Sequence, residues 1–268
     1  MQRRLVILLG VLALSAGTAF ATGATGAANA STLGVSPSAV NPGGLAQGIG
    51  PSSDVAGVLH STTSTNWSGY ADTAGTYTSA SASWVQPAGK CSSGDQYAAF
   101  WVGIDGYASA TVEQTGSEVD CVGKTVEYSA WYEMYPGPSE NYSNTVKAGD
   151  HFTATITWVS GKKFTLYLDD STEGWSHTTT ASLTSTPARS SAEVIAEAPC
   201  CTASGGILNL TNFGTVNFTG STANGEAIGT AALDPVEINM TDSSGNLRDT
   251  CSSLTSNENF SCTWLRDN

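Results

Sequence analysis

Positive charge is scarce in this sequence. Its 268 residues include 10 Lys and Arg against 23 Asp and Glu, which gives a formal net charge of −13 at pH 7 and a pI near 4.4. Nucleic acids and anionic membranes are bound by basic surfaces, so the composition argues against both as partners. An acidic surface keeps a protein soluble, and it also suits acid, where protonation of the carboxylates removes their mutual repulsion.

Histidine is almost absent, and several common catalytic motifs are missing. Of the three histidines, His60 lies in a segment that we expect to precede the folded domain, which leaves His151 and His177. A Ser-His-Asp triad would need one of these two, and the sequence has no G-x-S-x-G elbow. It also has no H-E-x-x-H zinc motif, phosphate loop or dinucleotide fingerprint. We therefore expect neither a metal nor a cofactor.

No C-x-x-C motif occurs among the six cysteines, which disfavours a zinc site and favours disulfides. Six cysteines allow 15 pairings, and a sequence alone does not select one of them. Proximity in the sequence favours two bonds, namely Cys91 with Cys121 and Cys251 with Cys262. The adjacent Cys200 and Cys201 either bond to each other or pair elsewhere.

No apolar run is long enough to span a membrane comfortably. The most apolar run, Leu5–Gly17, follows two arginines and precedes Ala-x-Ala sequences at residues 19–21 and 28–30. This order is typical of a secretory signal peptide. We expect residues 1–30 to be that peptide, cleaved near 21 or 30. The mature chain is then secreted, extracellular and free of the membrane.

Residues 31–63 are rich in Gly, Ser and Pro and contain no aromatic residue, so we expect a pro-segment or linker there. Residues 64–268 then form a single domain. In that domain small, aromatic and β-branched residues alternate between turn residues, and no amphipathic helix is evident. The clearest hairpin covers residues 151–170, with its turn at 160–163. Six further segments alternate in the same way: 76–87, 98–106, 125–136, 190–199, 206–220 and 235–242.

Many short strands without a repeat of fixed period predict an all-β antiparallel sandwich or barrel. Polar groups and large aromatic residues share faces on three of these strands, because successive side chains point to opposite sides. The groups on common faces are Trp101 with Asp105, Trp131 with Glu133, and Glu193 with Glu197. Such faces are typical of the floor of a concave site. Strand glutamates also protect sheets from aggregation, and strand tryptophans are often core residues.

Five motifs occur in a specific order. They are NWSGY from Asn66, WVGIDG from Trp101, EQTG from Glu113, YSAWYEMYP from Tyr128 and AEVIAE from Ala192. In this combination the sequence resembles the glutamic peptidases, the eqolisin family (peptidase G1 or A4) of secreted acid endopeptidases first known from fungi. The resemblance covers residues 66–197. It implies an antiparallel double-sheet β-sandwich of the concanavalin A-like or jelly-roll type.

The resemblance also implies a catalytic dyad of Gln114 and Glu197. Glu197 would act as general base and then general acid on a water molecule, and Gln114 would stabilise the oxyanion of the tetrahedral intermediate. It further implies that four residues line or support the cleft: Trp101, Asp105, Trp131 and Glu133. Glu193 shares a strand face with Glu197 but is about 13 Å away along the strand, so we expect it to be a hydrogen-bonding support.

A glutamate with an ordinary pKa near 4.3 alternates between base and acid most readily in acid, so an acidic optimum is expected. The expected partners are polypeptide substrates, and the expected state is a monomer.

One departure from the family concerns Glu113, which stands where an apolar residue is more usual. Parity turns it to the face opposite Gln114. Asn66, Asn141 and Asn259 begin Asn-x-Ser/Thr sequences, which carry glycans only in a host that makes them.

Two other functions remain open from the residues alone. In a carbohydrate-binding sandwich of the lectin type, Trp101, Trp131 and Trp175 would be platforms for stacking sugars. In a β-sandwich glycoside hydrolase, Glu133 and Glu197 would be the acid and base pair. The glutamine of Q-T-G disfavours the glycosidase, which needs no amide donor for an oxyanion.

Overall fold

The computed structural model describes residues 60–92, 94–200 and 206–268, and nearly all regular structure in these ranges is β-strand. The strands are β1 (His60–Ser64), β2 (Trp67–Asp72), β3 (Ser79–Val85), β4 (Gln96–Ile104), β5 (Val112–Val122), β6 (Thr125–Tyr135), β7 (Ser139–Asn141), β8 (His151–Ser160), β9 (Lys163–Asp170), β10 (Trp175–Ser182), β11 (Ala192–Glu197), β12 (Thr215–Ala223), β13 (Glu226–Ala227), β14 (Pro235–Thr241), β15 (Leu247–Cys251) and β16 (Phe260–Trp264). A short 3-10 helix, η1 (Ala231–Leu233), precedes β14. None of the helical structure in the described ranges is long and apolar enough to cross a membrane.

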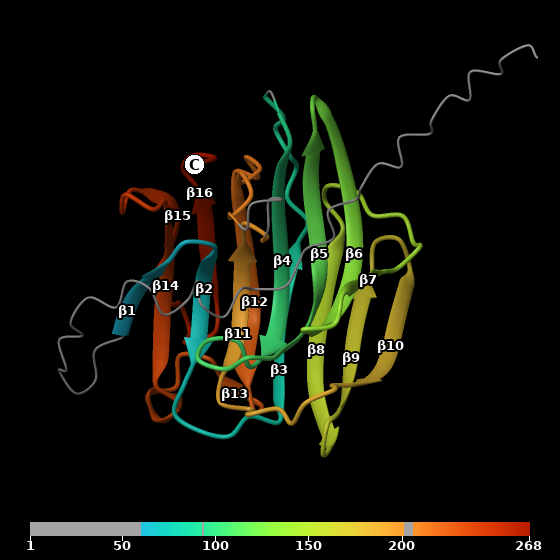
Figure 1. Ribbon diagram of the computed structural model, residues 1–268, viewed down its shortest axis with the longest axis vertical. Helices are drawn as coiled ribbons and strands as arrows, with labels where there is room; N and C mark the ends of the chain where they lie inside the picture. The colour runs from blue at the N-terminus through green and yellow to red at the C-terminus, as the bar shows by residue number, and fades with distance from the viewer. Residues whose placement is uncertain (1–59, 93, 201–205) are drawn as a thin grey trace, which may run out of the picture. The chain divides into compact units, whose positions relative to one another are not determined.

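The strands pair in the order β10-β9-β8-β3-β12-β16-β15-β14-β2-β11-β4-β5-β6-β7, with β1 added beside β14 and β13 beside β12. Neighbouring strands on this path are antiparallel, whereas β1 runs parallel to β14. The path folds back on itself, so that β11, β4 and β5 lie over β3, β8 and β9 (Figure 1). The expected all-β, antiparallel double-sheet sandwich is therefore confirmed.

The main core lies between the two layers. Aromatic side chains from both layers fill it, among them Phe100, Phe152 and Phe218, and the Trp84 ring stacks on Phe152 at 5.6 Å between centroids. The expected hairpin is formed by β8 and β9. Phe152, Ala154 and Ile156 on β8 are buried, and so are Phe164, Leu166 and Leu168 on β9, whereas the alternate threonines are partly or fully exposed. Period-2 alternation identified this hairpin because one of its faces is solvated.

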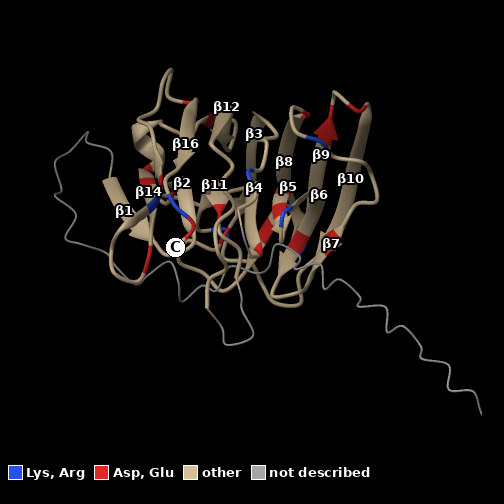
Figure 2. Cartoon of the chain, turned by 90° about the horizontal axis from the view of Figure 1, so that it is seen from above, with Lys and Arg blue, Asp and Glu red and all other residues tan. Residues whose placement is uncertain are grey.

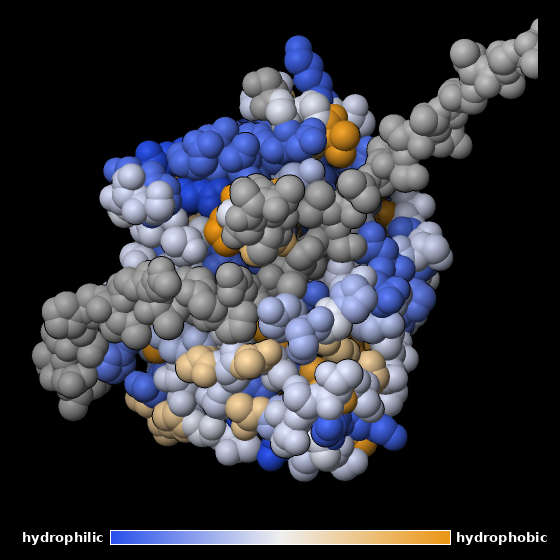
Figure 3. Space-filling model, viewed as in Figure 1, coloured by the Kyte–Doolittle hydropathy of each residue, from blue (hydrophilic) through white to orange (hydrophobic). Residues whose placement is uncertain are grey.

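The layer that contains β14, β2, β11, β4, β5 and β6, called here the front layer, buries a second apolar cluster on the face that points away from the main core. This cluster contains Trp67, Trp101 and Trp131, and Trp67 meets Trp101 edge to face at 4.8 Å between ring centroids. The surface drawn from this side is largely white and blue, with small separate orange areas (Figure 3). Viewed from above, the strands are mostly uncharged, with acidic residues more frequent than basic ones (Figure 2).

Two disulfides join neighbouring strands or loops. Cys91 is bonded to Cys121 and Cys251 to Cys262, so both pairings expected from proximity are confirmed. Cys200 is disulfide-bonded as well, and Cys201 lies outside the described residues.

Other boundaries differ from those expected. Residues 60–63, expected in the linker, begin the strand β1, and the expected signal peptide and most of the linker lie outside the described residues. The expected strand at 206–220 is also shorter. Regular pairing begins at Thr215, and residues 207–212 form isolated bridges, with Gly214 at a positive φ of 69° between the two parts.

Candidate active site

Four consecutive strands of the front layer, β11, β4, β5 and β6, form the floor of the candidate site. They are antiparallel neighbours, so residues opposite one another in the register share a face. Three rows follow: Glu197-Ala99-Glu118-Ser129, Ile195-Trp101-Gly116-Trp131, and Glu193-Gly103-Gln114-Glu133. The face that carries these rows is named here the site face. It brings together every expected site residue except Asp105.

Glu197 is the last residue of β11, and its carboxylate is held from two sides. The indole N–H of Trp101 donates to Oε2 at 2.8 Å, and the side-chain amide of Asn66 donates to Oε1 at 3.3 Å. Both donors favour the charged form of the carboxyl group. Glu197 itself is 3% exposed.

The pKa of Glu197 is raised well above its ordinary value, and burial is the main cause. The charge of Glu133 raises it further, whereas the hydrogen bonds from Trp101 and Asn66 lower it. Carboxyl groups whose pKa is shifted by burial and by specific hydrogen-bond partners are common at catalytic sites and also occur in structural networks.

Gln114 lies two strands away from Glu197, on β5. Its side-chain Nε2 donates to Oε2 of Glu133 at 2.6 Å, directly across the β5–β6 pair. A primary amide has two N–H donors, so the bond to Glu133 fixes the orientation of the group and leaves a second N–H for another acceptor. An amide held in this way is suited to stabilise a developing negative charge.

Two glycines explain why the motifs W-V-G and Q-T-G occur together. A Cβ on Gly103 would lie 2.7 Å from Cζ3 of the Trp101 ring, and one on Gly116 would lie 2.7 Å from Cβ of Trp101 and 2.1 Å from the carbonyl oxygen of Phe100. Real Cβ atoms do not approach other atoms so closely. Trp101 therefore needs both glycines as its floor, and it occupies the space between the Glu197 and Gln114 rows.

Trp131 and Glu193 complete the site face, and both side chains are fully buried. Trp131 lies across Gly116 from Trp101 and is fully buried. Glu193 is fully buried too, and burial raises its pKa well above the ordinary value. Neither of its carboxylate oxygens has a hydrogen bond of normal geometry, although Ser191 lies close enough to lower its pKa. The expected role of Glu193 as a hydrogen-bonding support stays a prediction.

Asp105 lies outside the site face, so the expected common face of Trp101 and Asp105 is not formed, because β4 ends at Ile104 and the backbone turns at Asp105. It follows β4 with a φ of 70°, and its carboxylate accepts the backbone N–H groups of Arg189 at 2.7 Å and Ser190 at 2.9 Å. The hydroxyls of Ser109 and Thr111 donate to it at 3.1 and 3.4 Å. Asp105 thus joins the β4–β5 loop to the segment before β11. The loop leads into β5, which carries Gln114, and the segment leads into β11, which carries Glu197.

Sequence reasoning missed Glu118 and Asp120 as members of the site face. Glu118 lies across Ala99 from Glu197 and accepts the Ser129 hydroxyl at 3.1 Å. Burial, followed by the proximity of Asp120, raises the pKa of Glu118 well above its ordinary value, and burial raises that of Asp120 to about 8. Parity from Gln114 along the same strand could have identified both residues.

Glu113 faces away from Gln114, as parity predicts, because it lies in register with Ile104 on the core side. It is fully buried, and burial, with a contribution from Asp105, raises its pKa to about 9.

The side chain of Asn66 is also fully buried, so it is not accessible to glycosylation in the folded chain. The sequence identified NWSGY as a motif, but it did not predict that Asn66 contacts Glu197.

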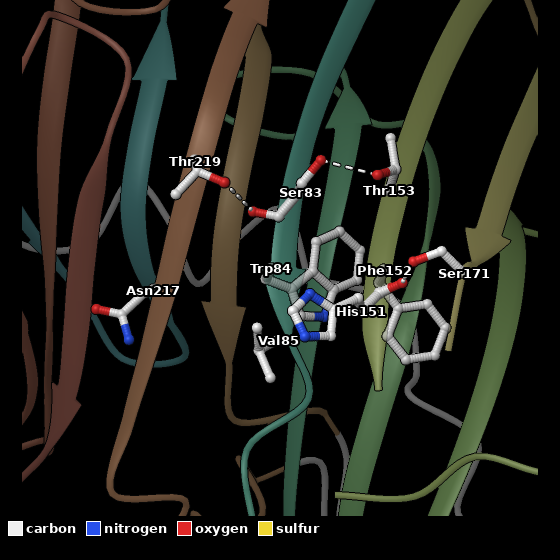
Figure 4. Close-up of a pocket in the computed structure, with 9 residues that line it drawn as sticks. All are labelled: Ser83, Trp84, Val85, His151, Phe152, Thr153, Ser171, Asn217 and Thr219. Carbon is white, nitrogen blue, oxygen red and sulfur yellow. Dashed lines mark hydrogen bonds between the residues drawn. The ribbon is translucent and has the colours of Figure 1, made fainter. Parts of the chain in front are cut away.

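Other parts of the described chain offer little for the same chemistry. The one grouping of possible metal ligands in these ranges is Asp249 with Cys251 and Cys262, and both cysteines are bonded in a disulfide. A pocket of about 330 Å³ lies on the back layer, over β3, β8 and β12 (Figure 4). Its lining, which includes Ser83, His151 and Thr219, contains no carboxylate and no residue of the site face.

Known proteins resemble this chain in sequence and in fold. A family model described as the Peptidase A4 family matches residues 65–264. Aspergillopepsin-2 of Aspergillus niger is 29% identical over 147 residues, which are 53% of this chain and 51% of that protein, so the match spans about half the length of this curated relative.

Solved structures give the same answer for the fold. A crystal structure of scytalido-glutamic peptidase with a transition state analog inhibitor has a TM-score of 0.65 and 25% identity, over 75% of this chain and 98% of that one. Aspergilloglutamic peptidase from Aspergillus niger has a TM-score of 0.55 and 25% identity, over 63% and 99%. The family match covers most of the described domain, and the chain therefore belongs to the Peptidase A4 family, the glutamic peptidases that its motifs resemble.

Proposed function

We propose that the chain is a secreted endopeptidase, active in acid, that hydrolyses peptide bonds with Glu197 and Gln114. One observation carries the proposal: Glu197 and Gln114 reach the same face of one sheet, on either side of Trp101, and each is already oriented by hydrogen bonds. Family membership and the relative with a bound transition state analog inhibitor support the same reaction class.

The first step forms the C–O bond. Ionised Glu197 takes a proton from a water molecule, and the water oxygen attacks the carbonyl carbon of the substrate. The electrons of the C=O bond move to oxygen, which becomes negative. An N–H of Gln114 donates to that oxygen, and one such preorganised donor is typically worth about 3 to 4 kcal/mol of barrier.

The second step breaks the C–N bond. Glu197, now protonated, returns its proton to the amide nitrogen, the amine leaves and the carbonyl re-forms. Because Glu197 must serve as base and then as acid, its pKa has to be balanced. Burial favours the protonated form, and the donors Trp101 and Asn66 favour the ionised form.

We further propose that the substrates are unfolded or flexible polypeptides and that the mature chain acts as an extracellular monomer. The sugar-stacking alternative has lost its support, because Trp101 and Trp131 are fully buried and Trp175 packs edge to face on Phe152. The glycosidase alternative gives no role to the oriented amide of Gln114.

The decisive test uses acid-denatured protein as substrate. The purified mature chain should cleave it in acid, and activity is followed from pH 2 to 7 because burial raises the pKa of Glu197 above its ordinary value. Gln114→Ala should lower kcat about 100- to 1,000-fold, and Glu197→Gln should abolish turnover. If the wild type is inactive across pH 2 to 7, or if Glu197→Gln retains full activity, the dyad assignment fails.

A further inference from the structure

Asn66 connects the start of β2 with the end of β11. Its carbonyl oxygen accepts the backbone N–H of Ala198 at 2.8 Å, directly after the catalytic candidate Glu197. Its side-chain Nδ2 donates to Oε1 of Glu197 at 3.3 Å. The side chain is fully buried, so bulk water does not compete for this bond.

Ser64 fixes the direction of that amide. The Ser64 hydroxyl donates to Oδ1 of Asn66 at 3.1 Å, and Oγ of Ser64 in turn accepts the backbone N–H groups of Asn66 at 3.3 Å and Trp67 at 3.1 Å. Since the hydroxyl donor is directed at Oδ1, the amide nitrogen is left to face Glu197. A flipped amide would place two acceptors, Oδ1 and the carboxylate, against each other.

We propose that Asn66, oriented by Ser64, is a positioning residue that fixes the Glu197 carboxylate and favours its charged form. The catalytic consequence rests on the function proposed above, whereas the effect on Glu197 does not. The contact is independent of the bond from Trp101, because the two donors use different oxygens of the carboxylate.

The surroundings of Glu197 make a neutral donor useful. Glu133 on β6 raises the pKa of Glu197 by its charge, and Glu118 on β5 interacts with Glu197 in the same unfavourable sense. Burial acts in the same direction, while the indoles of Trp101 on β4 and Trp67 on β2 act against it. Asn66 adds a donor without adding a charge, so it lowers the pKa of Glu197 and leaves the net charge of the site unchanged.

The test measures the ionisation of Glu197 directly. In full-length folded protein labelled with ¹³C at glutamate carboxyl carbons, the Glu197 signal is assigned by its loss in Glu197→Gln and titrated by NMR. Asn66→Ala should raise the titration midpoint of Glu197 by about one pH unit, the size expected for one lost hydrogen bond to a charged group. Asn66→Asp, which conserves the shape, should raise it at least as far, because a carboxyl group replaces the amide donor. Ser64→Ala should give a smaller shift in the same direction.

Asn239 provides a matched control. Its Nδ2 donates to Glu237 at 2.9 Å, and its Oδ1 accepts the hydroxyl of Thr250 at 2.8 Å, so it repeats the arrangement on β14 away from the site. Asn239→Ala should leave the titration of Glu197 unchanged.

The outcomes separate this inference from the proposed function. An unchanged Glu197 midpoint in both Asn66 variants overturns the inference, whatever the activity. If the midpoint rises and the acid limb of the pH profile of kcat/KM rises with it, both proposals are supported. If the midpoint rises and the limb stays in place, the inference holds and the role of Glu197 as the kinetic base is wrong.

Discussion

Glu133 has two effects on the candidate dyad, and they can be separated by one substitution. It accepts the amide of Gln114, and its charge raises the pKa of Glu197. Glu133→Gln conserves the shape and removes the charge. We expect kcat to fall about tenfold, because Gln114 loses a charged acceptor and its orientation becomes less fixed. We expect the acid limb of kcat/KM to move to lower pH, because a lost neighbouring negative charge lowers the pKa of Glu197.

The measurement is the pH profile of kcat and kcat/KM on a peptide substrate. Glu140→Gln, at an exposed position on β7, is the control and should leave both quantities unchanged. A limb that moves to higher pH in Glu133→Gln would contradict this account of the charge.

Period-2 parity could predict which residues share a face, but not which strands are neighbours. It placed Trp131 with Glu133 and Glu193 with Glu197, and the structure agrees. The pairing of Gln114 with Glu133 depends on register between strands, which the pattern of one strand does not specify. The contact of Asn66 with Glu197 was missed because Asn66 precedes β2 and its partner is 131 residues away.

At the level of the sheet, Gly116 is the residue that lets β5 pass beneath Trp101. Gly116→Ala would bring a Cβ to 2.1 Å from the carbonyl oxygen of Phe100, which is backbone and does not yield easily. We expect a loss of stability of about 3 kcal/mol or more, as for severe overpacking of a core. Urea unfolding of the folded chain measures it.

Gly75 offers the matched control for this substitution. A Cβ there would meet only the Tyr77 ring, at 3.8 Å, so Gly75→Ala should change stability by less than about 0.5 kcal/mol. Equal stability of the two variants would show that the Q-T-G glycine is not needed for packing, and its presence in the motif would then need another cause.

Strands were predictable where one face is apolar and the other is solvated, as in β8 and β9. β5 was recognised only as a motif, because the polar residues Glu113, Gln114 and Glu118 are all buried and hide the alternation. β10 was missed for the opposite reason, since Ser and Thr dominate its sequence and leave little apolar signal. The tertiary fold decides that β5 is buried on both faces and that the polar strand β10 lies at an edge of the sheet. A local sequence pattern does not contain this information.

Across the whole described domain, buried carboxyl groups couple stability to pH. Burial is the main cause that raises the pKa of Asp249 to about 7, of Asp72 to about 8 and of Glu113 to about 9. In the unfolded chain these groups would ionise near pH 4. Between pH 4 and these raised values the folded state binds more protons than the unfolded state, so stability falls as pH rises. We therefore expect the urea midpoint to be highest near pH 4 or below and to decrease steadily up to about pH 8.

Glu113 is the most informative single group for this dependence, because neither of its oxygens has a hydrogen bond of normal geometry and it lies on the core side, away from the site face. Glu113→Gln resembles the protonated form and cannot ionise. It should reduce the slope of unfolding free energy against pH by about 1.4 kcal/mol per unit between pH 5 and 8, and stabilise the chain at the upper end. Glu226→Gln, at an exposed position on β13, should leave the slope as it is. If Glu113→Gln loses stability equally at every pH, the carboxyl group is already ionised in the folded state, and the fall of stability with rising pH must come from other buried carboxyl groups such as Asp72 and Asp249.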